Sequence, residues 1–135
     1  ICLFFALSGK VVSIPGGDTI TVLQDKQQIK VRLYGIDAPE LKQPYGKKSK
    51  QFLANLIAGE VVEVEKSGKD RYKRTIGTVY LGSTDINAQM VANGYAWAYR
   101  KFSKKYTAQE SKAKSQKLGL WRDKEPISPW EWRKR

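Results

Sequence analysis

A small set of acids and arginines gives this chain its clearest capacity for chemistry. Each lies at the start, on the polar face or at the end of a predicted strand: Asp18, Arg32, Asp37, Glu40 and Arg74. The chain contains no histidine, which excludes histidine-activated nucleophiles, histidine bases and histidine metal ligands. Hydrolytic chemistry would therefore use carboxylates, arginine, lysine, tyrosine or a hard metal ion.

This set of groups meets the requirements of phosphodiester cleavage. Guanidinium groups stabilise the charge that develops on the phosphate oxygens, and a carboxylate can align and deprotonate a water. A hard cation held by oxygen ligands can bridge the water and the phosphate. Each residue alone also fits an ordinary role: a turn cap for Asp18, a solvated charge for Arg32, or a surface ion pair between Arg74 and Asp70. Their order along the chain favours the joint role.

The charge balance indicates a polyanionic partner. The chain of 135 residues carries 25 Lys and Arg against 13 Asp and Glu, a formal net charge of +12. Such an excess attracts nucleic acid by counterion release and steering. An acidic membrane surface is the second candidate, and a merely solubilising surface is the third.

Hydrophobic patterning predicts one α+β domain. Strands are expected over 10–14, 18–23, 29–36, 60–65 and 74–81, and helices over 47–58, 85–93 and 107–118. Thr107 and Glu110 have the spacing of a capping box for the last helix. Five short strands with an inserted helix favour a five-stranded Greek-key barrel of the oligonucleotide-binding (OB) fold with three helices.

The two ends of the chain differ from the rest. We interpret residues 1–9 as the remnant of an export signal, which would make the protein secreted or periplasmic, with membrane association through this apolar segment as a further expectation. A first buried strand is the alternative. Residues 10–121 form the expected domain. The basic tail, 122–135, should fold back onto it because tryptophans such as Trp130 and Trp132 are usually packed; a nucleic-acid-binding tail is the alternative.

Several segments resemble the staphylococcal nuclease (thermonuclease) family, in its secreted bacterial form. The matching segments are GGDTITV at 16–22, VRLYGIDAPE at 31–40, DRYKRTIG at 70–77, INAQMVANGYA at 86–96 and LGLW at 118–121. The resemblance is collinear and extends over 10–121. It implies a barrel with three helices and a calcium-dependent endonuclease that hydrolyses DNA and RNA, leaving 3′-phosphates, as a monomer without an obligate protein partner.

The resemblance also assigns roles to individual residues. Asp18 and Asp37 fall on the calcium carboxylates, and Ala38 on the position that offers a backbone carbonyl to Ca²⁺. Glu40 falls on the proposed general base, and Arg32 and Arg74 on the two phosphate-binding arginines. The residues expected to contact the nucleic acid are Arg71, Tyr72 and Tyr99.

The chain departs from the family pattern in three places. Gly16 replaces an acid that often lies two residues before the first calcium ligand, the loop after Glu40 is short, and the family's pair of base-stacking tyrosines is not cleanly matched. Either Tyr99 or Phe102 could serve as the stacking platform. A catalytically inactive OB-fold nucleic-acid-binding module is the rival function. Inactive copies should lack some of the five chemical residues, and this chain retains all five.

Overall fold

The protein is described from a computed structural model that covers residues 7–135. Its elements, in chain order, are β1 (Leu7–Gly16), β2 (Thr19–Gln24), β3 (Gln27–Leu33), β4 (Ile36–Asp37), α1 (Gly46–Ile57), β5 (Val61–Lys69), β6 (Thr75–Leu81), β7 (Thr84–Asp85), α2 (Ile86–Ala92), β8 (Trp97–Ala98), α3 (Thr107–Ser115), the 3₁₀ helix η1 (Gly119–Arg122) and α4 (Pro129–Trp132). No helix in this part of the chain is long and apolar enough to cross a membrane.

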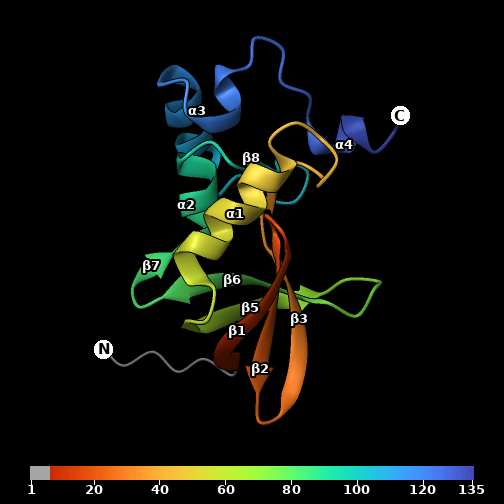
Figure 1. The fold of residues 1–135 in the computed structure, drawn as a ribbon, viewed down its shortest axis with the longest axis vertical. Helices are drawn as coiled ribbons and strands as arrows, with labels where there is room; N and C mark the ends of the chain where they lie inside the picture. The colour runs from red at the N-terminus through yellow and green to blue at the C-terminus, as the bar shows by residue number, and fades with distance from the viewer. Residues whose placement is uncertain (1–6) are drawn as a thin grey trace.

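Five strands close into the expected barrel. The sheet order is β3-β2-β1-β5-β6, and a parallel pairing between β3 and β6 joins its two edges. Figure 1 shows the strands in one half of the molecule and most of the helices stacked on the other half. The OB-like α+β fold predicted from the sequence is thus confirmed, with α4 as a helix beyond the three that we expected.

Strand β1 begins and ends outside the limits that the sequence suggested. It starts at Leu7, which is fully buried, and its first residues pair with β5. It then runs through Pro15 to Gly16 instead of stopping before that proline, with shifts in its register against β2. Such shifts bend a strand, which lets β1 pair with both neighbours. The rest of the export segment expected at 1–9, residues 1–6, lies outside the described residues.

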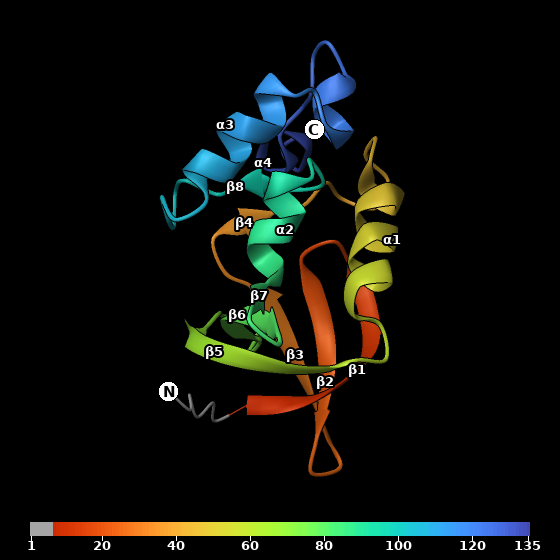
Figure 2. The same cartoon turned by 90° about the vertical axis from the view of Figure 1, so that its left-hand side faces the viewer.

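The barrel interior is filled by the apolar faces of the alternating strands. Ile20 and Val22 of β2 and Val31 and Leu33 of β3 are fully buried. Helix α1 covers one opening of the barrel, with its own buried residues Leu53 and Ile57 at helical spacing. Figure 2 shows α1 and α2 side by side above the strands.

The predicted capping box of α3 was wrong. The Thr107 hydroxyl donates to the carbonyl of Lys104, and the residue that caps the helix is Tyr106, without a side-chain hydrogen bond. The Glu110 carboxylate instead accepts from the Ala98 amide at 2.7 Å and pairs with Arg100. A local turn contact therefore takes the Thr107 hydroxyl away from the motif, and contacts with Ala98 of β8 and with Arg100 take the Glu110 carboxylate.

A buried asparagine joins the helical half to the barrel. Asn87 in α2 is fully buried, accepts from the Val79 amide at 3.1 Å and donates to the carbonyls of Tyr34 and Gly77. These contacts fix α2 to β6 and to the end of β3, the strand that carries Arg32.

Removing this side chain should destabilise the fold. We expect Asn87→Ala to lower the free energy of unfolding by about 2–4 kcal/mol, because buried backbone groups lose their partners. Chemical denaturation measures the change. Asn55→Ala, which removes an exposed amide that accepts from the Gln51 side chain, should change stability by less than about 0.5 kcal/mol. Equal losses in both variants would contradict the role of Asn87.

Candidate active site

Three adjacent strands bring distant residues to one end of the barrel. Thr19 of β2 pairs with Arg32 of β3, so Asp18 lies beside Arg32. In the parallel pair, Val31 of β3 faces Thr75 of β6, which places the start of β6 next to the same end of β3. The closure of the barrel, rather than proximity in the chain, therefore gathers these segments.

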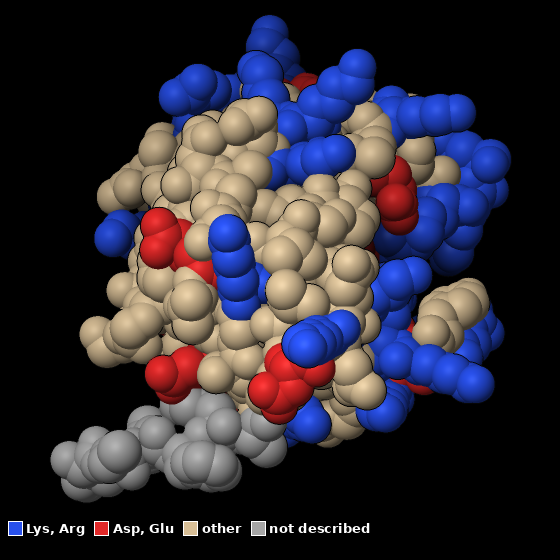
Figure 3. Space-filling view, turned by 60° about the horizontal axis from the view of Figure 1, so that its bottom comes forward, with Lys and Arg blue, Asp and Glu red and all other residues tan. Residues whose placement is uncertain are grey.

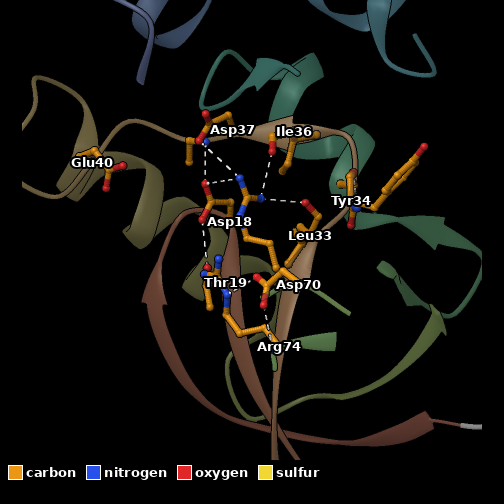
Figure 4. A network of polar contacts seen from close by, with 12 residues as sticks. Asp18, Thr19, Leu33, Tyr34, Ile36, Asp37, Glu40, Asp70 and Arg74 are labelled. Carbon is orange, nitrogen blue, oxygen red and sulfur yellow. Dashed lines mark hydrogen bonds and ion pairs between the residues drawn. The ribbon is translucent and has the colours of Figure 1, made fainter. Parts of the chain in front are cut away.

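The Arg32 guanidinium holds the centre of the site. Nη1 donates to the carbonyls of Leu33 and Ile36 at 2.8 and 3.0 Å. Nη2 lies 3.4 Å from Asp37 Oδ1 and 3.5 Å from Asp18 Oδ2. Figure 4 shows Asp18 and Asp37 close together beside the turn after β3. One guanidinium thus fixes the turn after β3 and aligns two carboxylates.

Asp37 is the most perturbed carboxylate of the group. Its side chain is only 1% exposed. Burial, opposed by the hydrogen bond from Arg133 and reinforced by the charge of Asp18, raises the pKa of Asp37 from 3.8 to about 6. Burial therefore favours the neutral form of this carboxyl group even with two arginines beside it.

The backbone around Asp18 is closely packed. The Ala38 amide donates to Asp18 Oδ2 at 2.8 Å, and the Thr19 hydroxyl donates to Oδ1. A Cβ atom on Gly17 would lie 2.8–2.9 Å from the side chains of Ser49 and Ala38. Only glycine fits the turn that presents Asp18, because helix α1 and the 38–40 loop press against it.

The acidic pair suits a hard cation. Asp18 and Asp37 offer carboxylate oxygens, the ligand type that Ca²⁺ prefers, within reach of one common nitrogen. The described residues contain no cluster of three or more His, Cys, Asp or Glu able to hold a metal ion. Calcium, which takes 6–8 oxygens, would thus need carbonyl, water or phosphate oxygens besides this pair.

Glu40 lies apart from the two aspartates, on the loop before α1. Figure 4 shows it to the left of the Asp18–Asp37 pair. Gln43 holds the loop through two hydrogen bonds. Its side-chain oxygen accepts from the Glu40 backbone amide, and its backbone amide donates to the Glu40 carbonyl. Gly46 lies so close to that carbonyl that no Cβ would fit.

A residue that sequence reasoning missed joins Glu40 to Asp37. Arg133, at the end of α4, donates to Asp37 Oδ2 at 2.7 Å and to Glu40 Oε1 at 2.8 Å. The hydrogen bond to Asp37 raises the pKa of Arg133 above its ordinary value, so the group is a permanent cation. The sequence predicted that the basic tail folds back onto the domain, but not that Arg133 reaches these acids.

A local signal marks the helix that carries Arg133. In the segment Ser128-Pro129-Trp130-Glu131, the Ser128 hydroxyl accepts from the Glu131 amide, and Pro129 occupies the first turn. Serine three residues before glutamate, with proline at the first helical position, is the pattern of a helix start. That pattern predicts α4 but not where its last residues point.

Arg74 is oriented by an acid of its own loop. Its Nε donates to Asp70 Oδ2 at 2.7 Å, and its amide donates to Oδ1. Burial alone would raise the pKa of Asp70, but the hydrogen bonds from Arg74 and Tyr72 outweigh it and hold the pKa below 3.8. In Figure 4, Asp18 lies between Asp37 above and Arg74 below.

The residues expected to contact nucleic acid occupy two places. Arg71 and Tyr72 lie on the exposed loop between β5 and β6, with the guanidinium of Arg71 5.1 Å from the Tyr72 ring centroid. Tyr99 stacks on Trp130 with ring centroids 5.3 Å apart, and meets the edge of Phe102. One face of Tyr99 is thus already covered by α4.

Comparison with known proteins places the chain. The profile of the family described as Staphylococcal nuclease homologue matches residues 30–123. The chain belongs to the staphylococcal nuclease family. A Micrococcal nuclease of Shigella flexneri is 45% identical over 139 aligned residues, which cover 93% of this chain and 80% of that protein. An uncharacterized endonuclease of Haemophilus influenzae is 44% identical, covering 93% and 72%.

A more distant relative covers a smaller part of its own length. A probable staphylococcal-like nuclease of rice (Oryza sativa subsp. japonica) is 37% identical over 80% of this chain and 29% of that protein. The part of the chain matched by the staphylococcal nuclease profile contains Arg32, Asp37, Glu40 and Arg74. Asp18 and Arg133 lie outside that range, so their place in the site comes from the geometry.

The Asp70–Arg74 pair makes a pH-dependent prediction. Because the folded pKa of Asp70 is lowered, its ion pair adds stability above its unfolded pKa, and that stability is lost as pH falls through the folded value. Asp70→Asn should therefore cost less than about 1 kcal/mol of unfolding free energy at pH 7. The difference in unfolding free energy between the variant and the wild type should become smaller below pH 3.8. Chemical denaturation at pH 7 and pH 3 measures this difference. A larger difference at pH 3 than at pH 7 would contradict the prediction.

Proposed function

We propose that the protein is a calcium-dependent endonuclease that hydrolyses phosphodiester bonds of DNA and RNA. The observation that carries the proposal is the convergence of Asp18 and Asp37 on Arg32 Nη2, at 3.5 and 3.4 Å. An acidic pair for a hard cation beside a guanidinium for phosphate is the equipment of metal-assisted phosphodiester cleavage. Membership of the family and the names of its relatives point in the same direction.

Each residue of the site would have its own task in the reaction. Asp18 and Asp37, with the Ala38 carbonyl, would hold Ca²⁺, which when bound polarises the phosphate and lowers the pKa of water. Arg32 would donate to a phosphate oxygen as charge develops there, and Arg74 would do so from the β6 side. Glu40, whose side chain is 43% exposed, would accept the proton of the attacking water.

The surface suits a long polyanion. Figure 3 shows Lys and Arg side chains spread over one face and gathered along one edge, whereas acidic side chains occur in small separate patches. A cavity of about 440 Å³ is lined by the aromatic residues Trp97, Tyr99 and Trp130, by the cations Arg100, Lys101, Lys114 and Lys134, and by Glu110. Aromatic faces among cations are suited to stacked bases and their phosphates.

The metal requirement can be tested with three parallel digestions. With calcium, the protein should degrade both DNA and RNA, and excess chelator should abolish the cleavage, because without a cation the two carboxylates would repel the phosphate. Magnesium should support less cleavage, since it demands a stricter octahedral geometry. Binding of nucleic acid without cleavage under every condition would instead support the inactive module, and full activity in chelator would refute the calcium role.

The roles of Arg32 and Glu40 can be tested by turnover. We expect Arg32→Lys to lower kcat roughly 10²–10³-fold, since lysine lacks the planar fork, and Glu40→Gln to lower it by roughly 10²–10⁴-fold. Arg122→Ala, which removes an exposed charge on η1, should leave kcat close to wild type. Circular dichroism and thermal melts should show that each variant folds. Near-wild-type turnover in either variant would remove that residue from the mechanism.

Export and 3′-phosphate products stay predictions of the family resemblance. The end group is read by treating the products with a phosphatase specific for 3′-phosphates. Location is read by fractionating cells that express the complete gene.

A further inference from the structure

The last helix brings a guanidinium to the two acids that the proposed mechanism assigns to different tasks. Arg133 Nη2 donates to Asp37 Oδ2 at 2.7 Å, and Nη1 lies 3.3 Å from Asp37 Oδ1 and 2.8 Å from Glu40 Oε1. Asp37 and Arg133 are 96 residues apart in the chain. A planar fork that bridges two carboxylates fixes their relative position better than a point charge can.

Helix α4 is held rigidly enough to deliver this group. Ser128 and Pro129 are buried, and Ser128 caps the helix through the Glu131 amide. Trp130 stacks on Tyr99 and meets the ring of Trp97 at 5.4 Å, nearly edge-on. These contacts anchor the turn of helix that precedes Arg133.

The loop of Glu40 and the segment before α4 are also linked directly. The buried Gln43 side chain donates to the carbonyl of Ile127 and accepts from the Glu40 amide. The backbone of the loop is thus fixed relative to α4. The exposed Glu40 carboxylate needs its own partner, and in the described residues Arg133 is the cation with which it forms an ion pair.

We propose that Arg133 is a positioning residue of the active site, a role that rests on the proposed nuclease function. Arg133 ties the Glu40 carboxylate to Asp37 and so sets where Glu40 meets the attacking water. The arginine acts through Glu40 and need not contact the substrate. This assigns the C-terminal helix to the catalytic apparatus as its support.

The geometry favours this role over one in which Arg133 blocks the calcium site. A carboxylate has about four acceptor positions, and three arginine nitrogens approach Asp37 within 3.4 Å. Oδ2 receives only the Arg133 Nη2 contact among the described residues, so it keeps a lone pair for a cation. Arg133 and Ca²⁺ can therefore occupy Asp37 together.

The test is a double-mutant cycle in turnover at saturating calcium. Arg133→Gln should lower kcat roughly 10–100-fold, as expected for a residue that orients a catalytic group, with a smaller change in KM. In the Glu40→Gln background the same substitution should change kcat by less than about threefold, because the group it positions is already gone. Arg133→Lys should lose less than Arg133→Gln.

A matched control removes the same charge from the same end of the chain. Arg135 lies two residues further and has its guanidinium over the ring of Trp132. Arg135→Gln should keep kcat near wild type, which separates positioning from a general loss of positive charge. Added guanidinium ion should restore part of the turnover of Arg133→Ala. The same addition should restore none of the turnover of Glu40→Gln.

A second readout does not depend on activity. In chelator, thermal unfolding of the two single variants and the double variant should be non-additive, since either single change breaks the same ion pair. Additive shifts in melting temperature, or equal loss of kcat in both Glu40 backgrounds, would overturn the proposal. Unchanged or faster turnover of Arg133→Gln at saturating calcium would also overturn the proposal, because it would indicate that Arg133 blocks the calcium site. An inactive wild type would refute the nuclease function, while the unfolding cycle would still report on the Arg133–Glu40 pair.

Discussion

The guanidinium of Arg32 is the constraint around which this end of the barrel is built. It leaves β3, satisfies the carbonyls of Leu33 and Ile36, and then reaches the carboxylates of Asp37 and Asp18. The turn that reverses the chain and the acids of the candidate site therefore share one support. Loss of Arg32 would release two backbone carbonyls and leave two adjacent negative charges with less compensation.

The electrostatics of the site follow from this crowding. Asp37 is buried next to Asp18, and even with Arg32 and Arg133 nearby its pKa stays near 6. A dication would relieve that excess of negative charge, and the scissile phosphate would in turn meet the cation and Arg32 together. In the proposed function, the positive surface would favour encounter with nucleic acid, whereas Asp18 and Asp37 would serve the chemistry.

The sequence predicted the barrel because each strand repeats an alternating pattern that survives in the fold, as in Ile20 and Val22 or Val31 and Leu33. The central acids and Arg32 were also foreseeable, since they lie at the start, on the polar face and at the end of predicted strands, in segments that resemble the family. The capping box predicted from Thr107 and Glu110 does not form, because the Thr107 hydroxyl bonds the nearby Lys104 carbonyl and the Glu110 carboxylate bonds the Ala98 amide. Strand β1 continues through Pro15 because shifts in its register bend it there. Arg133 was missed because its partners lie more than ninety residues away in sequence, and no periodic pattern encodes that distance.

Calcium binding by calorimetry tests the central claim most directly, because it does not depend on turnover. The account predicts that the wild type binds calcium and that Asp18→Asn and Asp37→Asn each weaken binding at least about tenfold. Asp25→Asn, in the turn between β2 and β3, should bind as the wild type does. Equal calcium affinity in the wild type and both site variants would contradict the claim that these two carboxylates, aligned by Arg32, form the cation site.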